Sequence, residues 1–151
     1  MARDIAGGFN HLYGDVFPLP EPIILKEGAR IMSLRDGTSK MSKSAESDMT
    51  RINLTDTAED ISQKIRKART DMHPVPASEK EWEDRPEAKN LLTIYSVLSG
   101  EPMAEVMKQF GGRQFSDFKP ALADLAVSRL SPITEEMNRL KKDPAEIDRL
   151  L

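Results

Sequence analysis

Residues 86–100, with the sequence PEAKNLLTIYSVLSG, predict a buried helix around which the rest of the chain can be arranged. Pro86 suits the first turn of a helix, where a backbone amide has no partner inside the helix. Gly100 ends the pattern, as glycine often does just past the last turn. The apolar positions recur every three or four residues, and they are Leu91, Leu92, Tyr95 and Leu98. This segment therefore offers one apolar face to a protein core.

The chain after residue 100 predicts three more helices of the same kind. The first opens at Pro102. The second is capped by Ser116, tolerates Pro120 in its first turn, and is bent or restarted at Pro132. The third follows the cap residue Asp143, with a proline at its first position. The apolar stripes of these helices are formed by Met103, Val106, Met107, Phe110, Phe118, Leu122, Leu125, Leu130, Ile133, Met137 and Leu140. These stripes predict a helical bundle.

Two further helices are expected before residue 86. The segment 2–13 predicts a helix that Gly14 stops, and its apolar face consists of Ile5, Phe9 and Leu12. Asp56 and Glu59 are spaced as a capping box and predict the start of another helix. That helix is expected to reach about Ala68, and its buried stripe is Ile61, Ile65 and Ala68.

The first third of the chain also contains extended segments. Residues 17–22, FPLPEP, hold three prolines, which remove backbone donors and favour extended chain. Ile23–Leu25 predicts a short buried strand, and Arg30–Leu34 predicts a second short extended segment. The expected fold class is mostly α: the trailing edge of an α/β fold followed by an α-helical bundle.

The composition excludes several classes of protein. The chain has 151 residues, a formal net charge of −3 and no cysteine, which rules out a disulfide framework and a thiolate zinc site. Its apolar runs are far shorter than the ~18 residues that a membrane span needs, and no signal peptide opens it. A reduced cytoplasmic setting fits. Basic and acidic residues are evenly spread, so a nucleic-acid partner must be met by individually placed lysines and arginines.

One loop carries residues with a chemical pattern. Residues 40–44, KMSKS, place two ammonium groups three residues apart with hydroxyls and amides between them. Such a loop suits a polyphosphate, because hydrogen bonds between charged groups and phosphate are among the stronger ones. The alternative from the residues alone is a solvated surface loop with two incidental lysines.

This string is the signature loop of the class I aminoacyl-tRNA synthetases, and its surroundings resemble the bacterial tryptophan-specific members. The segments that carry the resemblance are residues 29–34, 61–71, 90–100 and 118–123. The resemblance implies that residues 1–50 are the end of a Rossmann-like catalytic domain and that residues 51–151 are an α-helical domain that binds the tRNA anticodon. It implies ATP-dependent activation of tryptophan and its transfer to tRNA(Trp).

The resemblance also implies roles for single residues. Lys40 and Lys43 would contact the phosphates of ATP and the pyrophosphate that leaves, and the adenine would lie against Ile31. The remaining residues expected to line the ATP site are Met41, Ser42 and Ser44. ATP with Mg²⁺ would enter as substrate, without a tightly bound cofactor or a metal site of the protein. Members of the family are usually cytoplasmic homodimers, with no membrane partner.

The sequence departs from the family pattern in several places. Ala45 and Glu46 follow the signature where Asp-Pro is common, and Gly37 and Ser39 stand where Pro and Lys are common. The family's histidine signature and tryptophan pocket are not found in these residues. The chain is therefore expected to be a carboxy-terminal portion that is inactive without an amino-terminal half.

Two alternatives stay open: a tyrosine-specific relative, and a non-catalytic helical module that binds RNA or protein and keeps the loop as a relic. The basic residues Lys64, Arg66, Lys67 and Arg69 are expected to form a solvated helix face rather than a tRNA contact. Trp82 is expected to anchor the connector between residues 72 and 83 onto the bundle.

Overall fold

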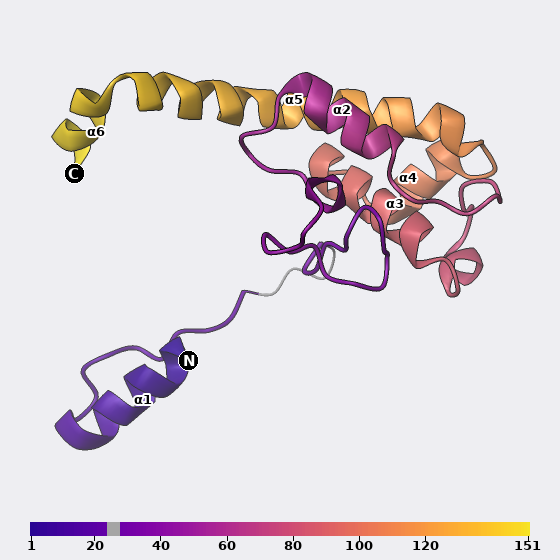
Figure 1. The fold of residues 1–151 in the computed structure, drawn as a ribbon. Coiled ribbons are helices and arrows are strands. Elements are labelled where there is room, and N and C mark those ends of the chain that lie inside the picture. Colours follow the sequence, from indigo (N-terminus) through magenta and orange to yellow (C-terminus); the bar gives the residue numbers. More distant parts are fainter. Residues whose placement is uncertain (24–27) are drawn as a thin grey trace.

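The computed structural model describes residues 1–23 and 28–151, and these residues are mostly helical (Figure 1). The helices are α1 (Ala2–Tyr13), α2 (Ala58–Arg66), α3 (Pro86–Ser99), α4 (Met103–Phe110), α5 (Phe115–Lys142) and α6 (Pro144–Leu150). Two short 3₁₀ turns, η1 (Asp48–Thr50) and η2 (Glu79–Trp82), lie in the connecting segments. The expectation of a mostly helical fold is confirmed. No helix in the described part of the chain is both long and apolar enough to cross a membrane.

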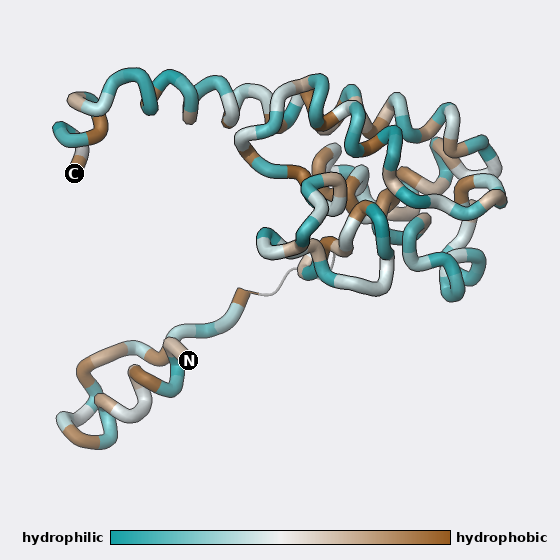
Figure 2. The backbone as a smooth tube through the Cα atoms, viewed as in Figure 1, coloured by the Kyte–Doolittle hydropathy of each residue, from teal (hydrophilic) through white to brown (hydrophobic). Residues whose placement is uncertain are grey.

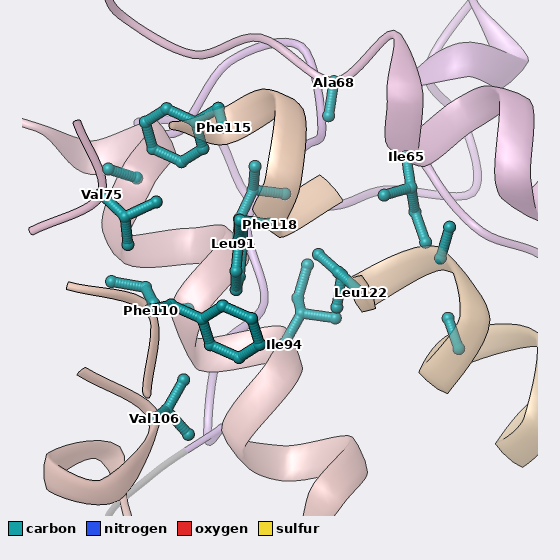
Figure 3. Packing of buried hydrophobic residues seen from close by; sticks show 14 of the residues in the cluster. Ile65, Ala68, Val75, Leu91, Ile94, Val106, Phe110, Phe115, Phe118 and Leu122 are labelled. Atoms are coloured by element: carbon teal, nitrogen blue, oxygen red, sulfur yellow. The ribbon is translucent and has the colours of Figure 1, made fainter. Parts of the chain in front are cut away.

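Helices α2 to α5 enclose one hydrophobic core. Helix α2 lies along α5, and α3 packs against both α4 and α5 (Figure 1). The largest fully buried side chains of the helices are Ile61, Ile65, Leu91, Leu92, Val106, Phe118 and Leu122. Figure 3 shows several of them, including Ile65, Phe118 and Leu122. The rings of Phe110 and Phe118 meet edge to face with their centroids 5.0 Å apart, and Tyr95 lies 4.9 Å from Phe110. Such aromatic pairs add roughly 0.5–1.5 kcal/mol each to the burial of their area.

Several helix boundaries agree with the sequence because proline and glycine mark them. Pro86 is the first residue of α3, and Gly100 ends that helix with a left-handed backbone at φ 78°. Pro102 directly precedes α4. The carboxylate of Asp143 caps α6 by accepting from the amide of Glu146.

Other boundaries differ from the sequence prediction. The capping box of α2 consists of Thr57 and Asp60 rather than Asp56 and Glu59, and α2 ends at Arg66 rather than at Ala68. Thr55, Asp56 and Thr57 are all residue types that cap helices, and the carboxylate of Asp56 instead accepts from the backbone amide of Asn53 and pairs with Lys64. Ala68 is buried as expected, although it lies just beyond the helix.

Helix α5 also differs from the sequence prediction. It begins at Phe115, one residue before the expected cap, and it runs without a break through Pro132. A proline inside a helix normally costs ~3 kcal/mol because it removes a backbone hydrogen bond. The hydroxyl of Thr134 donates to the carbonyl of Leu54 at 2.8 Å, so the helix is held against the start of the α2 region just beyond the proline.

Helix α1 forms as predicted but buries none of its residues. It lies apart from the bundle (Figure 1), and its apolar residues alternate with polar ones along the helix (Figure 2). Its contacts are to the turn that follows it: Asn10 donates to the carbonyl of Phe17 at 2.7 Å, and the Phe9 ring lies 4.9 Å from the Phe17 ring. The chain in this region therefore packs on itself.

The expected strands are largely not seen. Most of the predicted strand Ile23–Leu25 lies outside the described residues, and Ile23 itself is exposed. Arg30–Leu34 is an irregular segment in which Met32 makes an isolated antiparallel bridge to Lys40. Leu34 is fully buried in the helical core. Within residues 1–23 and 28–151 no strand is present, because the isolated bridge between Met32 and Lys40 is too short to form one.

Candidate phosphate-binding loop

The start of the signature loop pairs with the segment that precedes it. The amide of Met41 donates to the carbonyl of Ile31 at 3.1 Å, and the amide of Ser33 donates to the carbonyl of Ser39 at 2.8 Å. Ile31 and Met41 are both half-buried against the hydrophobic core. The structure therefore brings the expected adenine-binding residue next to the expected phosphate loop.

A buried asparagine fixes this pair of segments on the bundle. Asn90 lies in α3, and its amide group accepts from the nitrogen of Met32 and donates to the oxygen of Met32, both at 2.9 Å. These two bonds occupy the side of Met32 that faces away from the loop. Asn90 was not singled out in the sequence, although a polar residue on a predicted buried helix face is a signal for such a role.

The turn between the two segments is held by Asp36. Its carboxylate accepts from the Thr38 amide at 3.0 Å and from the hydroxyls of Thr38 and Ser39 at 2.6 and 2.5 Å. The hydrogen bonds from Ser39 and Thr38 lower the pKa of Asp36 to about 2. Gly37 is packed against the start of α3, where a Cβ atom would lie 2.4 Å from the backbone nitrogen of Glu87. A side chain at position 37 would therefore displace the turn from α3.

The signature residues themselves point to solvent. Lys40, Ser42, Lys43 and Ser44 are exposed, and Met41 is half-buried. In the described part of the chain neither lysine forms an ion pair, so both ammonium groups are free to meet an anion. The hydroxyls of Ser42 and Ser44 lie 3.0 Å apart and hydrogen-bond to each other. The assignment of these five residues and Ile31 to an ATP site stays a prediction.

The prediction that the basic residues of α2 form a solvated face is partly wrong. Lys64 is only 3% exposed, and its ammonium lies 2.5 Å from carboxylate oxygens of both Asp48 and Asp56. Burial alone lowers the pKa of Lys64, but hydrogen bonds to these carboxylates raise it overall. Arg66 and Lys67 are exposed, as expected. The sequence did not reveal the partners of Lys64, because Asp48 lies sixteen positions earlier in the chain.

Two basic side chains from other segments cap the end of α2. Arg35 donates to the carbonyl of Lys67 at 2.7 Å, and Lys119 donates to the carbonyl of Ala68 at 2.8 Å. Cations are stabilised at the carboxyl end of a helix by its dipole. Burial and the nearby charge of Arg35 lower the pKa of Lys119. These contacts give Arg35 and Lys119 a structural role.

The connector is anchored as predicted. Trp82 packs against the core, and the ammonium of Lys89 lies 5.4 Å from its ring centroid. Beside it, Arg85 binds the carboxylate of Asp71 through two hydrogen bonds of 2.8 Å. Although burial opposes ionisation, the hydrogen bond from Arg85 contributes to holding the pKa of Asp71 below its ordinary value. His73, in the same connector, is exposed.

The comparisons with known proteins define the class. A family model described as tRNA synthetases class I (W and Y) matches residues 1–131, and the chain belongs to this family. Among curated relatives, the tryptophan–tRNA ligase of Caulobacter vibrioides is 52% identical over all of this chain, which covers 44% of that protein. The tryptophan–tRNA ligase of Rhizobium meliloti is 58% identical over 89% of this chain and is covered to 38%. The chain thus spans less than half the length of these relatives.

Solved structures agree. The tryptophanyl-tRNA synthetase of Mycoplasma pneumoniae matches 91% of this chain with a TM-score of 0.75 and 30% identity, and 42% of that protein is covered. The enzyme from Campylobacter jejuni, solved with ADP and tryptophan, matches 99% of this chain with a TM-score of 0.60 and 25% identity, and 44% of it is covered. The mostly helical arrangement described above is therefore similar to part of these larger structures.

Proposed function

We propose that the chain is the portion of a tryptophan–tRNA ligase that supplies the phosphate-binding loop and a helical tRNA-binding region. The observation that carries this proposal is the match of 52% identity over the whole chain to a tryptophan–tRNA ligase. The reaction joins tryptophan to ATP as an adenylate, releases pyrophosphate, and transfers the tryptophanyl group to tRNA(Trp). In this proposal, residues 1–50 belong to the catalytic domain and residues 51–151 belong to the tRNA-binding domain.

The loop supplies positive charge where negative charge develops. Lys40 and Lys43 donate to phosphate oxygens of ATP and of the leaving pyrophosphate, which stabilises the transition state electrostatically. Ser42 and Ser44 offer hydroxyls to the same phosphates, and magnesium enters with ATP as part of the substrate. Ile31 and Met41 supply the half-buried apolar surface against which an adenine packs. The paired backbone of these two segments supports this arrangement.

The tryptophan pocket is assigned to another part of a full-length cytoplasmic enzyme, which we expect to be a homodimer. Adenylate formation requires amino acid and ATP to be held together, and this positioning accounts for several kcal/mol of the barrier. We therefore expect the 151-residue chain alone to catalyse no tryptophan-dependent exchange of pyrophosphate into ATP. A non-catalytic module with a relic loop would show no exchange in any context.

A chimera tests the proposal. The residues of the Caulobacter vibrioides ligase that precede its aligned segment are joined to this chain, and pyrophosphate exchange is measured with tryptophan and with tyrosine. Exchange that depends on tryptophan supports the proposal, whereas exchange with tyrosine alone would identify the tyrosine-specific relative. No exchange with either amino acid, by a folded chimera, would favour the relic loop.

Lys43→Ala in the same chimera sharpens the test. We expect the exchange rate to fall by roughly 10–200-fold, because the variant loses one or two charge-assisted hydrogen bonds. Each ~1.4 kcal/mol of lost stabilisation corresponds to a tenfold lower rate. The KM for tryptophan should hardly change, since the loop faces phosphates. A variant with normal turnover and a raised KM for tryptophan would contradict the role given to Lys43.

A further inference from the structure

The carboxyl end of the signature loop is bound to the helical bundle by a buried lysine. Lys64 lies on the inner side of α2 beside Ile65. Its ammonium bridges two carboxylates at 2.5 Å each: Asp48, four residues after the signature, and Asp56, two residues before α2. An ammonium that is removed from water is costly unless it is paired and hydrogen-bonded. The bridge satisfies that requirement and joins the loop to the helix.

Arg51 and Asn53 extend this bridge toward the signature. The Arg51 guanidinium donates to the carbonyls of Ala45 and Ser47 at 2.9 and 3.4 Å, and it lies 3.1 Å from the Asp48 carboxylate. The side-chain amide of Asn53 donates to the same carboxylate at 2.9 Å. Residues 45–48 are therefore tied down by several bonds, whereas residues 42–44 next to them point to solvent.

Both ends of the loop are thus fixed from the helical side. The amino end is held by the pairing of Met41 with Ile31, a segment that Asn90 of α3 binds in turn. The carboxyl end is held by Lys64 of α2. A loop whose ends are fixed loses less conformational freedom when it closes on a ligand, and a ligand consequently binds it more tightly.

We propose that Lys64 is a positioning residue for the phosphate loop: by binding Asp48, it fixes the end of the loop so that Lys43 meets a polyphosphate in a preset position. The proposal rests on the proposed function of the loop. Lys64 does not contact the phosphates in this scheme, because its charge is neutralised by Asp48 and Asp56. The hydrogen bond from Lys64 is also the main cause of the lowered pKa of Asp48.

The test compares two carboxylates of the same segment in the 151-residue chain. Asp48→Ala removes the loop side of the bridge, and the Asp48 side chain is 54% exposed, so the fold should survive its removal. Glu46→Ala is the matched control, because Glu46 is exposed in the same segment and carries the same charge. Binding of magnesium pyrophosphate is followed by NMR shifts of the loop amides.

Charge and positioning predict opposite results. Loss of a carboxylate near Lys43 should by charge alone tighten pyrophosphate binding, and Glu46→Ala should bind as well as or better than the wild type. Asp48→Ala should instead bind about tenfold more weakly, and Asp48→Glu, which keeps the carboxylate, should recover most of the affinity. Equal affinity for Asp48→Ala and Glu46→Ala would overturn the proposal.

Hydrogen exchange provides the second measurement and covers loss of folding. In Asp48→Ala and in Lys64→Met, the hydrogen-bonded amides of Ala45, Thr50 and Arg51 should exchange about tenfold faster, while those of Leu91 and Phe118 stay protected. Unchanged exchange of these three amides in both variants would overturn the proposal. Absence of pyrophosphate binding by the wild type would contradict the proposed function of the loop, and the exchange rates would still decide whether Lys64 holds its end.

Discussion

Helices α1 and α2 show the same apolar spacing and meet different surroundings. In α2, Ile61 and Ile65 are completely buried against α5. In α1, Ile5 is 68% exposed and Leu12 is 74% exposed. Apolar spacing therefore predicts that a helix forms and which face is apolar, but burial depends on what lies opposite that face. In α2 the opposite surface is α5, whereas α1 contacts mainly its own following turn.

The largest difference is expected from a matched pair of phenylalanines. Phe118→Ala should lower the free energy of unfolding by roughly 3–5 kcal/mol, because a fully buried ring leaves a cavity in the core. Phe9→Ala in α1 should change it by less than about 1 kcal/mol. Urea unfolding followed by the fluorescence of Trp82 measures both. Equal losses would show that α1 is as well packed as the bundle.

A smaller effect is expected at the start of α2. Thr57→Ala removes the capping box and should cost about 1 kcal/mol of unfolding free energy. Ser116→Ala serves as the control, because Ser116 was expected to cap α5 but lies inside that helix. Removal of the Ser116 hydroxyl should change the free energy of unfolding by less than about 0.5 kcal/mol. A larger loss for Ser116→Ala than for Thr57→Ala would support the cap positions predicted from the sequence.

The smallest effect concerns acid. The hydrogen bonds from Thr57 lower the pKa of Asp60 in the folded chain. A lowered folded pKa means that this contribution to α2 is fully present above the unfolded pKa of about 3.9 and is lost as pH falls through the folded pKa. Carboxyl NMR should show Asp60 titrating below its ordinary range, and Thr57→Ala should return it toward that range. An unshifted Asp60 in the wild type would exclude the capping box.

The sequence predicted the helices best where single residues mark their ends. Pro86 and Gly100 define the two ends of α3 unambiguously. At α2, the adjacent cap-forming residues Asp56 and Thr57 allow more than one start of the helix. Pro132 suggested a break in α5 because the backbone hydrogen bond that it removes can be read from the local sequence. The contact of Thr134 with Leu54 joins residues that are distant in sequence, so it could not be predicted.

The candidate site was predicted only in part, for the same reason. The signature residues are contiguous, so the string itself points to them. Their supports are distant in sequence: Asn90 binds Met32, and Lys64 binds Asp48. Buried polar residues on predicted core faces were the available signal, but their partners become known only when the chain is folded.

We propose that residues 40–44 bind a polyphosphate, and titration of the 151-residue chain with magnesium pyrophosphate tests this claim. The wild type should bind with NMR shifts centred on this loop. Lys40→Ala/Lys43→Ala should lose at least tenfold in affinity, because each charge-assisted bond contributes about 1.5–3 kcal/mol. The control Lys141→Ala/Lys142→Ala removes two exposed lysines at the end of α5 and should bind as the wild type does. Equal losses in both double variants, or shifts centred away from the loop, would contradict the claim.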